Sequence, residues 1–326
     1  MKSIKKSISY IILSIFGLFM VMPFAWMLIT SAKSQIEVNK PKLSFLPIDD
    51  FDVINYQNEK YNVKIIKTEG EYTWIHIFDK DGKIKRPFYK IKTDRISHER
   101  KFNIHWENYK RAFKKVPFGR YFLNTLIVSF LTVLGVIFTS SLAAYAFARM
   151  RFKGSDALFY VFISMMMVPQ PIYLIPSYVL MNHLGWIDTY CALIIPWMAN
   201  IFTIFLLRQH FKTIPQDLFD AAMIDGCSTF EILWKIILPI SKSVLATASV
   251  FALISSWNSF MWPLVMTNSE ELRVLQVGLS YFSQESSSQT TLLMAASSFS
   301  ILPLIVVFLF AQKRIISSFA STGLKG

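Results

Sequence analysis

The chain has few of the residues that build catalytic or metal centres. Its 326 residues include only two cysteines and five histidines. Cys191 lies at the start of an apolar segment and Cys227 lies in a charged one, so we expect no disulfide between them and assign both to packing. The histidines are scattered, and neither an HExxH motif nor a paired Cys/His cluster is present. The sequence therefore predicts neither a metal site nor an enzyme.

A phosphate-binding loop is also absent. No Gly-rich loop ending in Lys-Ser or Lys-Thr occurs in the chain, so we expect that the chain holds no ATP and hydrolyses none. The long apolar segments contain almost no ionisable residues, whereas carriers driven by protons or sodium need such groups inside the membrane. These absences predict that the energy for any transport comes from another subunit.

Apolar residues are abundant. The chain is 53% hydrophobic and 15% aromatic, with a mean hydropathy of +0.40, which is typical of a polytopic membrane protein. Six segments are long enough to cross a hydrocarbon core, which takes roughly 20 helical residues. They are residues 10–31, 121–146, 157–181, 189–208, 243–267 and 293–312. Lysines flank the first, and no small-residue cleavage site follows it, so it is expected to be a retained span and not a signal peptide.

The basic residues beside these segments predict their orientation. With the N-terminus inside, the short inner segments carry most of the Lys and Arg, whereas the outer segment 182–188 has none and 268–292 has only Arg273. By the positive-inside rule, both termini and the segment 209–242 are cytoplasmic in a bacterial-type inner membrane. The formal net charge of +13 follows largely from this pattern, and without a groove-reading motif we expect no binding to nucleic acid.

The first outer segment, residues 33–120, is far longer than a connection needs to be. Residues 62–68 and 72–78 alternate as strands do, and the turn Asp81-Gly82 leads into residues 84–92. We expect a small extracytoplasmic β-meander within an insertion at about 49–102. Its expected apolar face comprises Trp74, Ile75, Ile77, Phe78, Ile84, Phe88 and Tyr89. Three strands alone are marginally stable, so we expect the sheet to pack against the membrane domain or a partner protein. The alternative is a self-contained sheet with no binding role.

Residues 215–239 form a charged element between two apolar segments. Pro215 suits a first helical position, and Asp225-Gly226 supplies a turn. Ser228 and Glu231 have the spacing of a capping box that starts a second short helix, which Pro239 ends. Small residues at the bend would let another protein approach the backbone closely. The element therefore predicts either a docking site for a soluble partner or a simple connector.

Polar residues within the spans are candidates for a translocation path. Gln170 lies between two prolines, and Asn258 lies beside Trp257 in a band with Trp262 and three serines. Amides and indoles suit a hydroxyl-rich ligand such as a sugar. Hydrogen bonding between helices is the alternative role, and it applies more strongly to Asn124 and Asn200.

The element 215–239 resembles a family motif. Asp220-Ala221-Ala222, Gly226 and Ile236-x-Leu238-Pro239 match in spacing the E-A-A-x3-G-x9-I-x-L-P loop of bacterial ABC importer permeases. The wider pattern is similar to the carbohydrate branch, near the smaller of the two maltose-type permeases. The supporting segments are Ile214-Pro215, Ile224-Asp225-Gly226, Trp257-Asn258, Pro303, Gln312 and Gly323-Leu324-Lys325-Gly326. The resemblance covers residues 103–326 well and 1–47 loosely.

The sequence departs from the family pattern at four places. Asp220 replaces the usual Glu, and Cys227 replaces a usual Ala. Ser259 stands where an acidic residue is common, which puts the details of substrate recognition in doubt. The insertion at about 49–102 lies outside the pattern, so the resemblance implies no role for it.

The resemblance implies an all-α polytopic fold with six transmembrane helices of the type I ABC importer. Residues 1–32 would hold the N-terminal tail and the first helix, 33–120 the outer segment, and 121–326 the other helices with the coupling loop 209–242 and a C-terminal tail that reaches the ATPase.

The resemblance also implies a mechanism. A second permease would pair with this chain, a cytoplasmic ATPase dimer with ATP and Mg would bind the coupling loops, and an external binding protein would deliver sugar. ATP-driven closure would switch the permeases between inward- and outward-facing states. The implied coupling residues are Asp220, Ala221, Ala222, Asp225, Gly226 and Pro239; the candidates for the path are Gln170, Asn200, Trp257 and Asn258. A glycerol-phosphate importer of the same family, a secondary carrier and a membrane-embedded enzyme remain alternatives.

Overall fold

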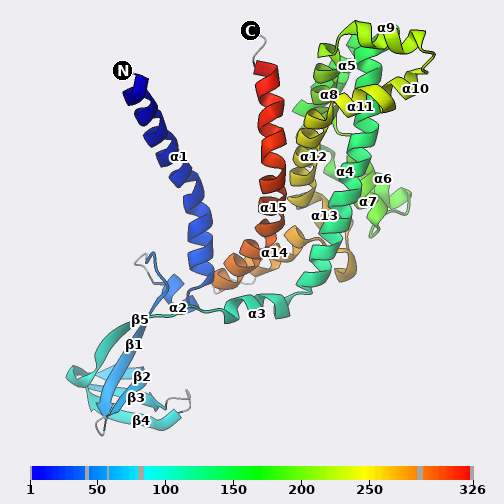
Figure 1. Cartoon of the computed structure of the whole chain (residues 1–326). Coiled ribbons are helices and arrows are strands. Elements are labelled where there is room, and N and C mark those ends of the chain that lie inside the picture. The colour runs from blue at the N-terminus through cyan, green and yellow to red at the C-terminus, as the bar shows by residue number, and fades with distance from the viewer. Residues whose placement is uncertain (1, 41–43, 57–58, 80–83, 285–288, 324–326) are drawn as a thin grey trace. The chain divides into compact units, whose positions relative to one another are not determined.

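The structure is a computed structural model that describes residues 2–40, 44–56, 59–79, 84–284 and 289–323, and helices dominate it (Figure 1). The chain falls into two compact units. The first comprises Met1–Lys115 with Phe282–Phe299, and the second comprises Val116–Tyr281 with Ser300–Gly326. The first unit carries all the strands of the described residues, and the second carries the element 215–239 and the candidate path residues.

Four helical segments of the described residues are long and apolar enough to cross a membrane. They are Lys6–Ser31 within α1 (Lys2–Ser31), Phe118–Arg149 (α4), Tyr190–Thr213 (α7 Tyr190–Ile194 with α8 Ile201–Thr213) and Thr290–Lys313 within α15 (Thr290–Gly323). Two bent helix pairs raise the number to six if each pair is one span. The described helices thus provide four to six crossings, against the six expected.

The expected third span, 157–181, is broken in its middle. Helix α5 (Ser155–Ser164) continues as a 3₁₀ turn to Met167, and α6 (Gln170–His183) starts after a bend of 102°. Val168 is extended, with ψ 114°. A residue that precedes proline avoids the helical region, and Pro169 follows here. The local chemistry of the Val168-Pro169 dipeptide therefore explains the break.

The expected fifth span, 243–267, is also interrupted. Helix α12 (Lys242–Trp257) ends at Asn258, and a short helix, α13 (Met261–Met266), follows. The Asn258 side-chain amide donates to the Ile254 carbonyl at 3.0 Å. The Asn258 backbone N–H donates to the same carbonyl at 3.1 Å, so Asn258 closes the helix end with two bonds to one acceptor. A short 3₁₀ turn and α14 (Leu275–Gln284) then lead towards α15.

The Asp188 carboxylate holds the loop before α7 against the loop after α13. Asp188 has a positive φ of 61°, and its carboxylate accepts bonds from the Asn268 N–H, the Ser269 N–H and the Ser269 hydroxyl. Burial alone would raise the pKa of Asp188, but these bonds and the charge of Arg273 lower it. The carboxylate thus fixes residues 184–189 against residues 268–269.

The first unit contains a five-stranded antiparallel sheet in the order β4-β3-β2-β1-β5 (Figure 1). The strands are β1 (Ile48–Tyr56), β2 (Glu59–Glu69), β3 (Tyr72–Phe78), β4 (Ile84–Lys92) and β5 (Ser97–Phe102). Sequence analysis expected three of them and missed β1 and β5. These two strands are rich in charge, which disfavours a strand locally, but they pair with each other through Asp52–His98 at 2.5 Å and Asp50–Arg100 at 3.3 Å. The expected turn Asp81-Gly82 lies outside the described residues.

The sheet buries one apolar cluster, which differs in part from the expected face. Its buried members are Ile54, Tyr61, Val63, Ile75 and Ile77, with Tyr56, Tyr89, Ile91 and Ile96 packed against them. Phe88 and Ile84 were expected to be buried there, yet they are 64% and 54% exposed. The pairing of β3 with β4 shifts register twice near Ile77, and Phe88 has a φ of 52°. These irregularities break the simple alternation on which the expectation relied.

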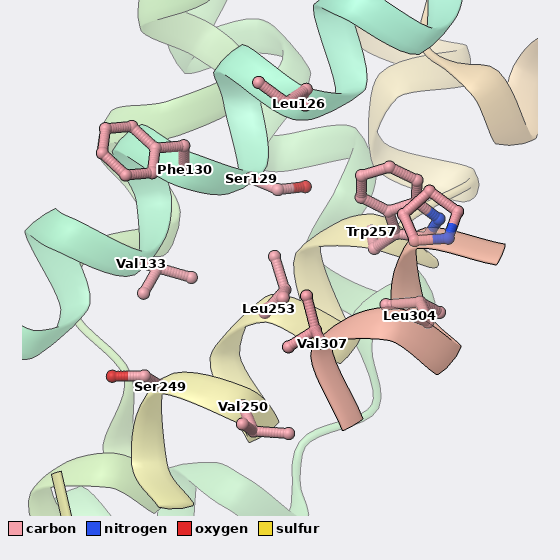
Figure 2. A pocket seen from close by; sticks show the side chains of 11 residues that line it. Leu126, Ser129, Phe130, Val133, Ser249, Val250, Leu253, Trp257, Leu304 and Val307 are labelled. Carbon is pink, nitrogen blue, oxygen red and sulfur yellow. The ribbon is translucent and has the colours of Figure 1, made fainter. Parts of the chain in front are cut away.

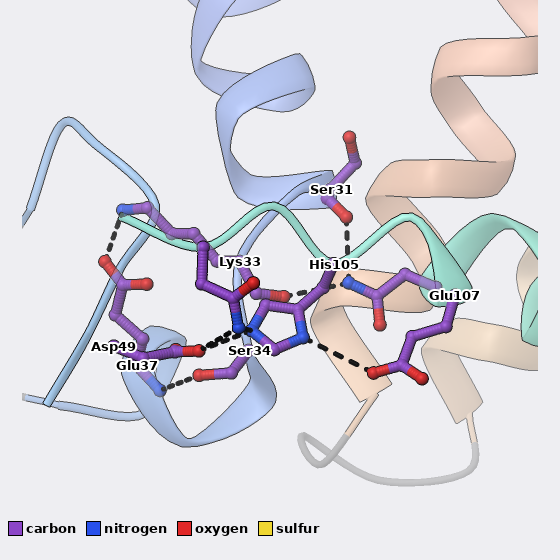
Figure 3. A network of polar contacts seen from close by, with 9 residues as sticks. Ser31, Lys33, Ser34, Glu37, Asp49, His105 and Glu107 are labelled. Atoms are coloured by element: carbon purple, nitrogen blue, oxygen red, sulfur yellow. Dashed lines mark hydrogen bonds and ion pairs between the residues drawn. The ribbon is translucent and has the colours of Figure 1, made fainter. Parts of the chain in front are cut away.

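A polar network joins the base of the sheet to the end of α1 (Figure 3). The His105 N–H donates to the Ala32 carbonyl at 2.9 Å, and the His105 ring lies 2.7 Å from the Asp49 carboxylate. Asn108, on α3 (Glu107–Lys115), donates to the Ser31 and Lys33 carbonyls. Burial raises the pKa of Asp49, but hydrogen bonds from Asn103, Ser34 and His105 lower it below its usual value. Within its own unit, the sheet is thus anchored at β1 and β5.

Candidate functional site

The element 215–239 starts with a regular helix and a turn built on glycine. Helix α9 (Gln216–Ile224) ends at Asp225, and Gly226 follows with a φ of 81°. The Gly226 N–H donates to the Met223 carbonyl at 3.1 Å, and the Cys227 N–H donates to the Ala222 carbonyl at 3.0 Å. This pair of bonds is the Schellman motif, which needs a left-handed residue at the position of Gly226. Glycine is favoured there by the positive φ and not by a lack of space, since no described atom lies within 4 Å of an added Cβ.

The second helix of the element starts at the expected capping box. The Ser228 hydroxyl accepts from the Glu231 N–H at 3.4 Å, and the Glu231 carboxylate accepts from the Ser228 N–H at 3.0 Å. The predicted capping box is therefore confirmed. Lys235 adds an ion pair to Glu231 at 2.7 Å.

Pro239 does not end this helix where it was expected to. The chain runs through α10 (Thr229–Glu231), a π-helical segment Ile232–Ile237 and α11 (Leu238–Ile240), and the bend of 85° into α12 comes after Ile240. A proline inside an α-helix clashes with the carbonyl four residues earlier. The wider π turn just before Pro239 relieves this conflict, so the helix continues past the proline.

Of the residues implied to couple this chain to an ATPase, all but one are exposed. Asp220, Ala221, Asp225, Gly226 and Pro239 are exposed. Ala222, by contrast, is 4% exposed and packs in the apolar cluster beneath α9. Its side chain is occupied in the chain's own core, because Phe219 and Ala222 occupy the inner face of α9 at a spacing of three residues.

Sequence analysis missed the apolar side chains that this element exposes. Ile224 is 86% exposed, Phe230 59% and Met223 56%. They surround the bend at Gly226. The inward spacing of Phe219 and Ala222 was a signal for them, since it places residues 220, 221, 223 and 224 outward. Contiguous exposed apolar patches are typical of interaction sites.

Three of the four candidate path residues line one cavity. Gln170, Asn200 and Asn258 border a space of about 230 Å³ between α4, α6, α8 and α12. The other polar side chains around it are Thr132, Ser255, Ser256 and Ser259. Among the described residues that line it, none is charged. Two polar groups at its wall, the Thr132 hydroxyl and the Trp197 indole N–H, are buried without a hydrogen-bond partner in the described part of the chain.

Two of the cavity residues also serve the local fold. The Asn200 side chain accepts from the Thr203 N–H at 2.8 Å and caps the start of α8. The Asn258 side chain bonds the end of α12 and accepts from Gln276 at 3.3 Å. These bonds fit the structural alternative, whereas the free groups of Thr132 and Trp197 fit a ligand. Asn124 has a structural role alone, since it bonds the Glu271 and Arg273 carbonyls and the Tyr190 hydroxyl.

Trp257, the fourth candidate, faces away from this cavity. It is 4% exposed, and its indole N–H donates to the Ser300 carbonyl at 3.2 Å. Figure 2 shows it at the edge of a different, apolar cavity of about 380 Å³ between α4, α12 and α15. Successive residues of a helix point about 100° apart, so Trp257 and Asn258 face different neighbours. Trp257 therefore lines the apolar cavity and not the polar one, and its assignment to the path stays a prediction.

Among the described residues, no group of three or more His, Cys, Asp or Glu side chains lies close enough to hold a metal ion. The chemistry available in the second unit is therefore that of uncharged amides and hydroxyls in the cavity and of an exposed apolar patch at α9.

Residues 135–320 match the family described as the binding-protein-dependent transport system inner membrane component. The chain belongs to this family. This membrane component is 34% identical to the arabinooligosaccharides transport system permease protein AraQ of Bacillus subtilis over 207 residues, which cover 64% of this chain and 74% of that protein. It is 33% identical to the sn-glycerol-3-phosphate transport system permease protein UgpE of Yersinia pestis over 60% of this chain and 71% of that one.

A solved structure shares the fold of this membrane component. It is a bacterial ABC transporter involved in the import of the acidic polysaccharide alginate, with a TM-score of 0.69 and 23% identity across 96% of this chain and 97% of that one. The family match begins within α4 and takes in α9 and the residues that line the polar cavity except Val128 and Thr132.

Proposed function

We propose that this membrane component lines part of the path of an ATP-driven importer of neutral oligosaccharides. The observation that carries the proposal is the polar cavity between α4, α6, α8 and α12, where amides and hydroxyls gather without a charged side chain among the described residues. Amide and hydroxyl groups bond sugar hydroxyls in either direction. The relative AraQ, named for arabinooligosaccharides, supports the same substrate class.

An anionic solute is the second candidate, because relatives are named for glycerol phosphate and alginate. Recognition of a phosphate or carboxylate uses Arg or Lys. The part of the cavity that this chain supplies offers neither. An anionic solute would therefore need Arg or Lys side chains from a partner subunit. The uncharged cavity lining that this chain supplies favours a neutral sugar.

The assembly we propose has four kinds of subunit. A second permease would complete the path, a cytoplasmic ATPase dimer would hold ATP and Mg, and an external binding protein would deliver the sugar. The exposed apolar patch of Met223, Ile224 and Phe230 beside Gly226 supports α9 as the place where the ATPase docks. Asp220 and Asp225 would supply polar contacts at its rim, and the C-terminal tail would reach the same interface.

The topology we propose counts α5 with α6 as one span and α12 as another, with Thr229–Ile240 in the coupling loop outside the membrane. Six crossings put α9 on the same side of the membrane as both termini, and the basic residues near the spans favour the cytoplasm for that side. The sheet of β1–β5 would then lie outside, with the binding protein or the second permease as its partner.

Transport by the reconstituted complex tests the proposed substrate. Proteoliposomes that contain this chain, its second permease, the ATPase dimer and the binding protein should accumulate labelled arabinotriose when ATP is enclosed with the ATPase. Labelled glycerol 3-phosphate and an alginate trisaccharide serve as the anionic comparison. Uptake of the anions without the neutral sugar would overturn the proposal.

Removal of the sheet tests its external role. The strands β1 and β5 pair from Ile48–Phe102 to Val53–Ser97, and the Asn103 N–H bonds the Pro47 carbonyl. A short Gly-Ser linker can therefore replace residues 52–100 and keep Asp49 and His105 in place. We expect the complex to assemble while uptake at low binding-protein concentration falls by about tenfold, a typical coupling effect. Unchanged uptake and assembly would rule out a role for the sheet in docking.

A further inference from the structure

Two arginines cross between the C-terminal ends of α4 and α8. Arg149, the last residue of α4, donates to the Phe211 carbonyl of α8 at 2.6 Å and to the Ile214 carbonyl just beyond it. Arg208, near the end of α8, donates back to the Phe147 carbonyl of α4 at 3.2 Å. Each helix end is therefore bonded at its C-terminal carbonyls by an arginine of the other helix.

Each arginine also contacts a third helix. Arg149 contacts α9, which follows α8 in the chain, and Arg208 contacts α5, which follows α4. The Arg149 guanidinium lies 4.0 Å from the ring centre of Phe219 and 3.0 Å from the Gln216 side-chain oxygen, both on α9. The same two kinds of contact occur on the other side. The Arg208 guanidinium lies 3.7 Å from the ring centre of Phe159 and 3.0 Å from the Asp156 carboxylate, both on α5.

The aromatic partners of both arginines are buried, whereas the polar partners Gln216 and Asp156 are exposed. Arg208 is 5% exposed, Phe219 4% and Phe159 3%, and Arg149 is half-buried. Tyr145 of α4 stacks on Phe219, with ring centres 6.5 Å apart and an interplanar angle of 19°. Cation–π contacts are strongest where water is excluded, so Arg208 is a fixed group, and Arg149 is held by its contacts with the Phe211 and Ile214 carbonyls and the Phe219 ring.

A simpler role explains only part of this arrangement. Arginine at a helix C-terminus stabilises the helix dipole, and arginine beside a span sets its orientation. Both roles account for the bonds to the Phe211, Ile214 and Phe147 carbonyls. Neither accounts for the contacts with a ring and a first-turn side chain on the next helix, which occur at both arginines.

We propose that Arg149 and Arg208 are positioning residues that form a cross-brace, so that α9, α5 and the ends of α4 and α8 move as one body. The cavity is connected to this body at two points: Asn200 starts α8, and Gln170 starts α6 just after the bend that follows α5. A displacement of α9 is thereby delivered to the cavity lining. This inference rests on the proposed function for the source of the displacement, the ATPase, but the brace itself is a property of this chain.

Distances measured between spin labels test the brace without any transported solute. The two native cysteines are replaced (Cys191→Ser, Cys227→Ala), and labels are attached at the exposed positions Asp217→Cys on α9 and Ala157→Cys on α5. The full complex should give a single narrow distance distribution with and without ATP. Arg149→Met and Arg208→Met should each broaden it or add a second distance, because the contact between the helices is lost.

The matched control is Arg151→Met. Arg151 is exposed two residues after Arg149, so this change removes the same charge from the same side of the membrane and leaves the brace intact. Its distance distribution should equal that of the parent. Broadening in Arg151→Met, or none in Arg149→Met, would overturn the proposal.

A functional measurement separates positioning from folding. In proteoliposomes supplied with arabinotriose and the binding protein, Arg149→Met should raise the number of ATP molecules hydrolysed per sugar at least fivefold, the lower end of typical coupling effects. Arg149→Lys should not restore the ratio, because a point charge does not reproduce the planar fork that reaches several acceptors. An unchanged ratio in an assembled Arg149→Met complex would contradict the brace.

If the Arg149→Met protein does not accumulate in the membrane, Phe219→Leu still tests the brace. It keeps most of the apolar volume and removes the ring that contacts Arg149 and Tyr145, so the ratio of ATP hydrolysed per sugar should rise in the same direction, and an unaltered ratio would refute the brace. If the parent complex takes up no arabinotriose, the proposed substrate fails while the label distances still decide the brace.

Discussion

Replacing Gly226 with aspartate should lower ATP-driven uptake by about two orders of magnitude, near the upper range of measured coupling effects. An added side chain has room within the chain itself, since no described atom lies within 4 Å of a Cβ there. Aspartate is among the few residues that tolerate a positive φ, so the permease should still reach the membrane and assemble. The carboxylate would stand in the middle of the surface formed by Met223, Ile224 and Phe230 and would block close docking. Uptake and ATP hydrolysis are measured on the same vesicles.

The matched control for this change is Gly154→Asp. Gly154 has nearly the same backbone angle, φ 83°, and equally open surroundings. It precedes α5, where a carboxylate at a helix N-terminus is favourable. We expect normal uptake in Gly154→Asp. Normal uptake in Gly226→Asp, or an equal loss in both variants, would refute the role of α9 in coupling.

Replacing Thr132 with valine should lower uptake of arabinotriose by up to about tenfold, the worth of one hydrogen bond to a solute. Thr132 lines the polar cavity, and its buried hydroxyl has no partner among the described residues. Valine keeps the shape of the side chain and removes only the hydroxyl. The thermal stability of the purified complex should therefore stay the same or rise slightly, while the sugar concentration for half-maximal uptake increases.

Thr125→Val provides the comparison on the same helix. The Thr125 hydroxyl donates to the Tyr121 carbonyl and accepts from the Leu275 N–H, each at 2.8 Å. Its loss leaves the buried Leu275 N–H unpaired, at a cost of about 1–3 kcal/mol. This variant should melt earlier and keep the sugar dependence of the parent. If Thr132→Val melts earlier and transports normally, the cavity has a structural role only.

The sequence predicted those features that depend on neighbouring residues. The capping box of Ser228 and Glu231 and the turn at Gly226 are made within a few residues, so their spacing alone determines them. The polar character of the cavity was also predictable, because Gln170, Asn200 and Asn258 are conspicuous in apolar segments.

Features that depend on distant contacts escaped prediction. The direction of Trp257 is set by α4 and α15. Strands β1 and β5 become favourable when their opposite charges, distant in the sequence, meet across the sheet, as in Asp50–Arg100. Arg149 and Arg208 looked like orientation signals, because their Phe219 and Phe159 partners lie on other helices.

The π-helical segment Ile232–Ile237 provides a structural reason for the fixed spacing between Gly226 and Ile236 in the loop motif. Nine residues separate Gly226 from Ile236, and most of the π segment lies among them. A π turn holds about one residue more than an α turn, and one residue corresponds to a rotation of about 100° in a regular helix. A loop shortened by one residue there could still be fully helical, but α9 would be turned by roughly a quarter of a circle relative to α12. The length of this segment therefore sets the direction in which the chain presents its docking surface.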